Sequence, residues 1–289
     1  MIKELVIVSG KGGTGKTSLT ASFARLAQSK VITDCDVDAA DLHLVLNHRI
    51  LKEESFSDGK KGYINNKLCS GCGKCKSLCR FDAIEQKDNQ FYIEKTFCEG
   101  CALCSEFCPE QAIEMVDHES GKYFISETEY GPFVHAKLNI AEGNSGKLVT
   151  LIRKKAREIA TEKGLQLIIT DGSPGIGCPV IASITGATFL LIVTEPTVSG
   201  LHDLKRVFNL AQHFRVKCGL CVNKYDINME KTQEIKNFCE ENELHFLGQI
   251  PYDKAVTEAQ IMGKAVIELK DSQAANAIIE LWEKVFKQI

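Results

Sequence analysis

Apolar residues along the chain fall into short continuous runs that alternate with longer segments in which they recur every three or four positions. The short runs predict strands at 4–9, 30–36, 165–171, 188–194, 216–223 and 245–250. The longer segments predict helices at 16–28, 146–163, 200–213, 230–242 and 272–287. Strands that are apolar throughout and separated by helices belong to a parallel sheet covered on both faces. The pattern therefore predicts an α/β fold with a mostly parallel sheet.

The alternation stops between about residues 60 and 118, where cysteine, glycine and lysine replace the periodic apolar positions. Within this break the chain repeats itself, because CSGCGKCKSLCRFDAI (69–84) and CEGCALCSEFCPEQAI (98–113) match at every cysteine and at the closing Ala-Ile. Polar stretches that contain glycine, SDGKKG and HESGK, flank the break, as expected for a module looped out of a host domain. We expect a main domain at 1–60 and 119–289, with an inserted module at 61–118.

Composition and charge narrow the class of protein. The 289 residues include thirteen cysteines and have a net charge of −3. Eight of the cysteines lie in the two repeats, which favours metal ligation over disulfides. The charge gives no bulk attraction to nucleic acid or to an anionic membrane. No apolar run approaches the roughly 18 residues of a membrane span, and the first residues show no signal-peptide pattern, so we expect a cytoplasmic protein.

The segment GKGGTGKTS (10–18) stands between the first predicted strand and the first predicted helix. It fits the pattern G-x-x-x-x-G-K-[ST]. Glycines let backbone N–H groups surround a triphosphate, the lysine neutralises phosphate oxygens, and the threonine hydroxyl is offered to Mg²⁺. The alternative is a plain glycine turn. The motif predicts ATP or ADP binding by Gly10, Gly12, Gly13, Thr14, Gly15, Lys16, Thr17 and Ser18, with Thr17 on Mg²⁺.

The form KGGTGKT resembles the deviant Walker A motif of the MinD, ParA and nitrogenase-iron-protein class of P-loop ATPases. In that class the extra lysine, here Lys11, crosses a dimer interface to the partner's phosphates. The resemblance implies a P-loop NTPase fold of the SIMIBI type, ATP hydrolysis, and a homodimer, or a heterodimer with a related ATPase, that sandwiches ATP. The alternative is that Lys11 is a solvated loop lysine.

Further positions fit the same class. Asp36, in ITDCDVDAADLHL, matches the switch I aspartate that acts near the attacking water, and Asp171, in IITDGSPGIG, matches the Walker B carboxylate. The alternative for Asp36 is a solvated carboxylate at a strand end. By the same resemblance, Asn223 in VNKYD and Pro251 and Tyr252 in IPYD correspond to adenine-contacting ends of late strands.

Each repeat spells C-x₂-C-x₂-C-x₃-C, which is the spacing of two-cluster bacterial ferredoxins. Three closely spaced thiolates bind one face of a [4Fe–4S] cube, and the fourth reaches the other cube. Zinc is the competing ion, although structural zinc usually takes two separated C-x₂-C pairs. One cluster is expected on Cys69, Cys72, Cys75 and Cys108, and the other on Cys98, Cys101, Cys104 and Cys79.

The remaining cysteines have plainer interpretations. Cys218 and Cys221 form a C-x-x-C inside a predicted strand, where residues three apart face opposite sides, so we do not expect them to chelate together. Cys35 and Cys239 are expected to be small core or surface residues. Cys178 follows the Walker B position at a spacing similar to that of the bridging-cluster cysteine in nitrogenase iron protein, so a role at a dimer interface or in a redox relay stays open.

Taken together, the chain resembles MinD-superfamily P-loop ATPases that carry an inserted two-cluster ferredoxin module. The resemblance implies an ATPase whose nucleotide-driven dimer closure gates electron transfer to a redox partner protein. A second hypothesis is an iron–sulfur cluster carrier, and a third is a MinD- or ParA-like positioning protein. For the third, the last predicted helix offers an apolar stripe to a membrane, although its balanced charges favour packing in the core. The stripe consists of Ile278, Leu281, Trp282, Val285 and Ile289.

Overall fold

The computed structural model describes residues 1–139, 142–143 and 145–289. Contacts between residues divide the chain into two compact units. Unit 1 comprises Met1–Glu54, Tyr123–Lys137 and Ser145–Ile289. Unit 2 comprises Ser55–Lys122 and Leu138–Asn144, and it therefore contains all of the module that the sequence predicts at 61–118.

The chain forms a nine-stranded sheet with the order β11-β10-β9-β1-β8-β2-β7-β6-β3. From β11 to β7 every neighbouring pair is parallel, which confirms the predicted α/β fold with a mostly parallel sheet. The strands are β1 (Lys3–Ser9), β2 (Lys30–Asp34), β3 (His48–Ile64), β6 (Ile113–Thr128), β7 (Gly131–Leu138), β8 (Leu167–Pro174), β9 (Phe189–Thr194), β10 (Cys218–Asn223) and β11 (His245–Ile250).

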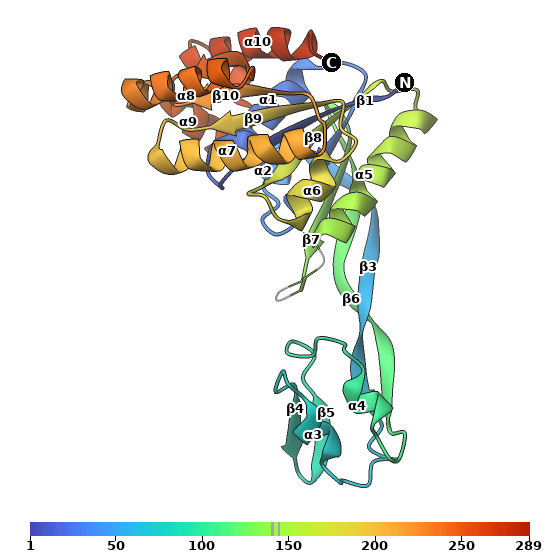
Figure 1. Ribbon diagram of the computed structural model, residues 1–289. Coiled ribbons are helices and arrows are strands. Elements are labelled where there is room, and N and C mark those ends of the chain that lie inside the picture. Colours follow the sequence, from blue (N-terminus) through green and yellow to red (C-terminus); the bar gives the residue numbers. More distant parts are fainter. Residues whose placement is uncertain (140–141, 144) are drawn as a thin grey trace. The chain divides into compact units, whose positions relative to one another are not determined.

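Helices cover both faces of the parallel strands (Figure 1). In β1 successive side chains pack against helices on opposite faces, which explains its unbroken apolar run LVIV. Leu5 and Ile7 pack in a core cluster with residues of α1, α9 and α10, whereas Val6 and Val8 pack in a second cluster with residues of α6, α7 and α8. The helices of unit 1 are α1 (Lys16–Leu26), α2 (Leu42–Val45), α5 (Ser145–Glu162), α6 (Cys178–Ile184), α7 (Val198–His213), α8 (Met229–Glu241), α9 (Lys254–Ile261) and α10 (Gln273–Phe286), with short 3₁₀ turns η1 (Tyr225–Ile227) and η2 (Val266–Glu268).

The apolar stripe of the last helix faces the protein interior. Ile278, Leu281 and Val285 of α10 are at most 3% exposed, and Trp282 packs on Phe23 with 4.9 Å between the ring centroids. The prediction of core packing is therefore confirmed. The apolar stripe, which motivated the alternative that this helix lies on a membrane, is not exposed. Among the described residues no helix is both long and apolar enough to cross a bilayer.

Two long strands were not predicted. β3 and β6 run through residues in which the sequence shows no apolar periodicity, and SDGKKG and HESGK, which flank the predicted module, lie inside them. Most side chains of β3 are exposed, so burial leaves no alternating pattern to read in the sequence. These residues become strands because they pair with neighbours that are distant in the sequence, and such pairing overrides local composition.

Unit 2 has a small core of its own. Its remaining elements are α3 (Lys74–Leu78), α4 (Leu103–Glu106) and the antiparallel hairpin of β4 (Ile84–Lys87) and β5 (Gln90–Ile93). Ile64, Ile84, Phe91 and Ile113 form its buried cluster. Repeat cysteines pack directly against this cluster, so the apolar residues fix where the thiols lie.

Candidate nucleotide site and cysteine pockets

The predicted P-loop connects the end of β1 to the start of α1. Gly15 caps the helix with a φ of 87°, and a Cβ at this position would clash with the Asn223 side chain, so only glycine fits without strain. Asn223 Nδ2 in turn donates a hydrogen bond of 2.8 Å to the Thr14 carbonyl oxygen. No side chain caps α1, so its first N–H groups and its positive dipole end are available to an anion.

A lysine and two carboxylates meet at the start of α1. Lys16 Nζ lies 3.3 Å from Asp171 Oδ1 and 3.5 Å from Asp36 Oδ2. Thr17 Oγ1 donates a hydrogen bond of 2.7 Å to Asp171 Oδ2. Asp34 at the end of β2 accepts the backbone N–H of Asp36 at 3.0 Å, which fixes the loop that carries Asp36. The sequence-predicted Lys16, Thr17, Asp36 and Asp171 are therefore brought together.

Electrostatics keep Lys16 charged at this position. Burial alone would lower the pKa of Lys16, but the negative charges of Asp171, Asp36 and Asp34 outweigh it and raise the pKa. Burial also raises the pKa of Asp36, and the nearby Lys16 only partly opposes this rise. The ammonium group of Lys16 can pair with a phosphate group, and the neighbouring carboxylates can pair with the divalent cation that accompanies it.

A cavity of about 840 Å³ opens beside these residues. Predicted residues from four separate parts of the chain line it: the P-loop, Asp36, Asn223, and the pair Pro251 and Tyr252. As far as the structure describes the chain, Gly10, Lys11, Thr14 and Asp171 do not line it. The predicted residues that do are Gly12, Gly13, Gly15, Lys16, Thr17, Ser18, Asp36, Asn223, Pro251 and Tyr252.

The sequence interpretation missed Glu195. This residue follows β9 directly, and its Oε2 lies 3.5 Å from Lys11 Nζ while its Oε1 accepts a 2.6 Å hydrogen bond from Lys224 Nζ. Lys11 also donates to Ser199 Oγ at 3.4 Å. These contacts hold the Lys11 side chain against residues of the same chain. The available signal was an acidic residue at the end of an apolar strand next to β1, the same signal that singled out Asp171.

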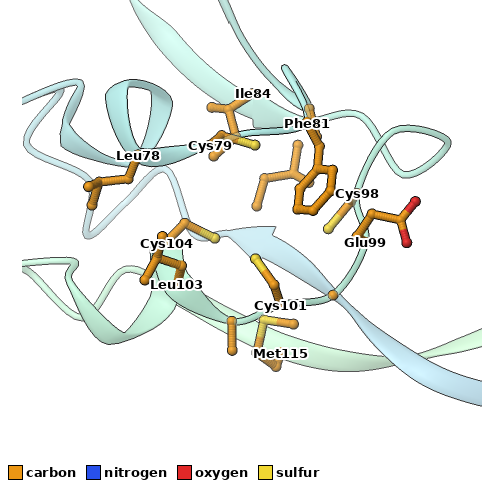
Figure 2. Close-up of a pocket in the computed structure, with 14 residues that line it drawn as sticks. Leu78, Cys79, Phe81, Ile84, Cys98, Glu99, Cys101, Leu103, Cys104 and Met115 are labelled. Atoms are coloured by element: carbon orange, nitrogen blue, oxygen red, sulfur yellow. The ribbon is translucent and has the colours of Figure 1, made fainter.

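The eight repeat cysteines line two pockets in unit 2. Each pocket combines three cysteines from one repeat with the last cysteine of the other, which is how the spacing assigns them to two clusters. One pocket is lined by Cys69, Cys72, Cys75 and Cys108. The other is lined by Cys98, Cys101, Cys104 and Cys79, whose sulfur atoms surround a common space in Figure 2.

Burial and neighbouring thiols act together on the cysteines of both pockets. All thirteen cysteines are free thiols, and burial together with neighbouring cysteines raises the pKa of Cys75 and Cys104. A bound cationic group favours the thiolate form of such cysteines, which is the form that ligates metals. Within the described residues no group of three or more His, Cys, Asp or Glu side chains is placed to hold a metal ion. The two clusters expected from the cysteine spacing therefore stay a prediction.

The other cysteines lie outside these pockets. Cys221 is buried in the core cluster on one face of the sheet, and Cys218 packs against the cluster on the opposite face, which confirms that they do not form a pair. Cys35 and Cys239 are buried. Cys178 is exposed at the first residue of α6, and its role stays open.

Known proteins resemble the chain over nearly its whole length. An uncharacterized protein of Methanocaldococcus jannaschii, MJ0578, is 34% identical over 291 residues, which covers 99% of this chain and 97% of the relative. An iron–sulfur cluster carrier protein of Pyrococcus horikoshii is 28% identical over 158 residues, about 50% of this chain and 53% of the carrier. Among solved structures, the septum site-determining protein MinD of Pyrococcus horikoshii complexed with Mg-ADP has a TM-score of 0.59 and 19% identity, over 99% of this chain and 97% of that one.

The likeness to MinD establishes the fold, and the family assignment agrees with the geometry of the site. Residues 5–266 match the family described as the CobQ/CobB/MinD/ParA nucleotide binding domain. This range includes the P-loop, Asp36, Asp171 and the cavity beside them. The chain therefore belongs to the CobQ/CobB/MinD/ParA family of nucleotide-binding P-loop proteins.

Proposed function

We propose that the chain is an ATPase in which the nucleotide state of the P-loop controls electron transfer through two [4Fe–4S] clusters held by unit 2. The observation that carries the proposal is the grouping of the repeat cysteines, three from one repeat and one from the other in each pocket, on the same chain as a P-loop site. The presence of both a nucleotide site and two cysteine pockets on one chain is what suggests that ATP binding and electron transfer are coupled.

The residues around the cavity have distinct parts in ATP hydrolysis. The free N–H groups at the start of α1 and the ammonium group of Lys16 bind the β- and γ-phosphates. Thr17 and Asp171, joined by a 2.7 Å hydrogen bond, would hold Mg²⁺, which would neutralise phosphate charge. Asp36, held by the backbone contact to Asp34, orients the water that attacks the γ-phosphate. Asn223, Pro251 and Tyr252, on the opposite wall, contact the adenine.

We propose that the active form is a dimer that sandwiches ATP. Lys11 lies outside the lining of the cavity and is bound to Glu195, so it does not serve its own nucleotide. The ion pair is only half-buried, with the Lys11 side chain 35% exposed, and such pairs are worth about 0–1 kcal/mol. Lys11 can therefore leave Glu195 for a partner's phosphates at little cost.

The second site holds the clusters. Cys69, Cys72, Cys75 and Cys108 would hold one, and Cys98, Cys101, Cys104 and Cys79 the other. When bound, each cluster supplies a one-electron redox centre. The apolar cluster of Ile64, Ile84, Phe91 and Ile113 holds the cysteines in place and limits the access of water.

Anaerobic kinetics test the proposal. The dithionite-reduced protein is mixed with a one-electron acceptor with and without MgATP, and the loss of cluster absorbance is followed by stopped flow. We expect MgATP to change the rate in the wild type and to have no effect in Lys16→Gln, which cannot bind the phosphates. Equal rates with and without MgATP in the wild type would end the coupling proposal.

A second candidate function is supported by one specific observation. Half of the chain is related to a protein described as an iron–sulfur cluster carrier. A carrier must release its cluster, whereas the cysteines here are packed against a buried core that favours retention. Incubation with an apo-ferredoxin distinguishes the two, because ATP-dependent transfer of iron and sulfide would favour the carrier, and retention after many turnovers of ATP would favour electron transfer.

A further inference from the structure

The two cysteine repeats have opposite charges. Residues 67–80, which contain the first repeat's cysteines, hold four cations and no Asp or Glu, and residues 98–110 hold three carboxylates and no Lys or Arg. All seven of these side chains are exposed. The cysteine spacing is the same in both repeats, so the ligation of a cluster does not require the difference. We name Lys67, Lys74, Lys76 and Arg80 the basic patch, and the opposing carboxylates are Glu99, Glu106 and Glu110.

The charge of the basic patch is not neutralised within the chain. No residue of the patch forms an ion pair with any residue that the structure describes. Other lysines of unit 2 do, since Lys61 lies 3.6 Å from Glu142 and Lys87 lies 3.0 Å from Glu85. Unpaired, exposed cations close together in the chain attract anionic partners and speed their association.

One residue of the patch lines the pocket of the first repeat. Lys74 lines that pocket together with Cys72, and its Nζ lies 5.7 Å from the centroid of the Phe107 ring. Phe107 is 53% exposed, and Leu68, next to Lys67 in the chain, is 54% exposed. Exposed apolar side chains beside charged ones have the composition of a protein-binding surface, with an apolar centre and a polar rim.

We infer that the basic patch docks an acidic one-electron carrier protein against the pocket of Cys69, Cys72, Cys75 and Cys108. The inference rests on the proposed function and names one of its partners. In the step that docking permits, the carrier loses one electron and the group held in this pocket gains it, and no atom is transferred. Both pockets are lined by one glutamate, Glu110 in the first and Glu99 in the second, but only the first is also lined by a lysine, Lys74, so the second is the more repulsive to an acidic carrier. The charges thus select one of two otherwise similar pockets.

A binding experiment with flavodoxin, a small acidic one-electron carrier, tests the inference. Affinity for the cluster-loaded protein is measured anaerobically by calorimetry at low and high ionic strength. The basic-patch variant carries Lys74→Glu, Lys76→Glu and Arg80→Glu, and the matched control carries Glu99→Lys and Glu106→Lys. Glu110 is left unchanged because it also lines the pocket of the first repeat. We expect the wild type to bind more weakly at high salt, the basic-patch variant to bind at least about tenfold more weakly, and the control to bind no more weakly.

Three results would overturn the inference. These are equal affinity in the wild type and the basic-patch variant, an equal loss in the control, or tighter binding of single-stranded DNA than of flavodoxin by the wild type. Iron and sulfide are determined on the same samples. Protein that never acquires clusters overturns the proposed function as well, whereas loaded protein with unchanged binding in the variant overturns the docking inference alone.

Discussion

The most informative structural perturbation removes Arg153, which binds a buried carboxylate in unit 1. Glu4 is 1% exposed, and Arg153 reaches both of its oxygens, with Nε at 2.7 Å and Nη2 at 2.8 Å. Arg153 Nη1 also donates to the carbonyl oxygens of Ala182 and Thr185 at the end of α6. Arg153→Met keeps the apolar stem and removes every one of these donors. Among the described residues, the Glu4 carboxylate then keeps Arg157, whose side chain is 52% exposed, as its cationic partner, together with a 3.3 Å hydrogen bond from Thr170 Oγ1.

The expected cost follows from this geometry. Breaking a buried ion pair by removing one partner costs about 3–5 kcal/mol, because the remaining charge stays buried. Arg157→Met is the matched control, since an exposed partner contributes about 0–1 kcal/mol. In the Arg153→Met background, Glu4→Leu removes the buried charge and is expected to recover most of the loss.

Urea unfolding of the three variants and the wild type measures these costs. Trp282 is the only tryptophan of the chain and packs on Phe23 in the core of unit 1, so its fluorescence reports this unit. The reasoning is refuted if Arg153→Met and Arg157→Met lose the same free energy of unfolding, or if Glu4→Leu restores nothing. Either result would mean that the loss reflects packing and not the unpaired charge.

Three further predictions concern the loop, the cysteines and pH. In Gly15→Ala an alanine must adopt the left-handed backbone conformation at a cost of about 1–2 kcal/mol, so calorimetry should show ATP binding about five- to thirtyfold weaker, and unchanged affinity would contradict the role of the turn. Cys108→Ser should remove about half of the iron, that of the first repeat's cluster, while Cys178→Ser should remove none; equal iron in both variants would argue against the cross-repeat grouping. Burial lowers the pKa of His135 to about 3, so the folded protein keeps it neutral while the unfolded chain takes up a proton below about pH 6.5. Stability therefore falls as pH falls through this window, and between pH 6 and pH 4 the wild type should lose about 2–3 kcal/mol more than His135→Phe, a difference that parallel pH profiles would exclude.

The parts of the fold that could be predicted are those whose residues are buried on both sides. β1, β8 and β9 each contain a continuous apolar run, LVIV, LII and FLLIV, because helices cover both faces of the sheet, so these runs indicate strands directly. β3 could not be predicted, because most of its side chains are exposed and its strand conformation depends on pairing with β6. The periodicity of apolar residues reflects which side chains are buried, so a strand with mostly exposed side chains shows no such periodicity.

Some residues of the candidate site could be predicted from the sequence and others could not. Lys16 and Thr17 were predictable because phosphate binding requires a fixed local pattern of residues. Glu195 was missed because its partners, Lys11 and Lys224, come from other strands and become neighbours only in the folded sheet. The grouping of cysteines was predictable because the C-x₂-C-x₂-C-x₃-C spacing matches that of two-cluster ferredoxins, in which the fourth cysteine joins the first three of the other repeat.

Stopped-flow oxidation of the reduced, cluster-loaded protein tests the central claim most directly. The account predicts that MgATP changes the rate of electron release in the wild type and leaves the rate unchanged in Lys16→Gln, with equal iron and sulfide in both proteins. Identical rates in the wild type with and without MgATP, in samples with full iron and sulfide content, would contradict it.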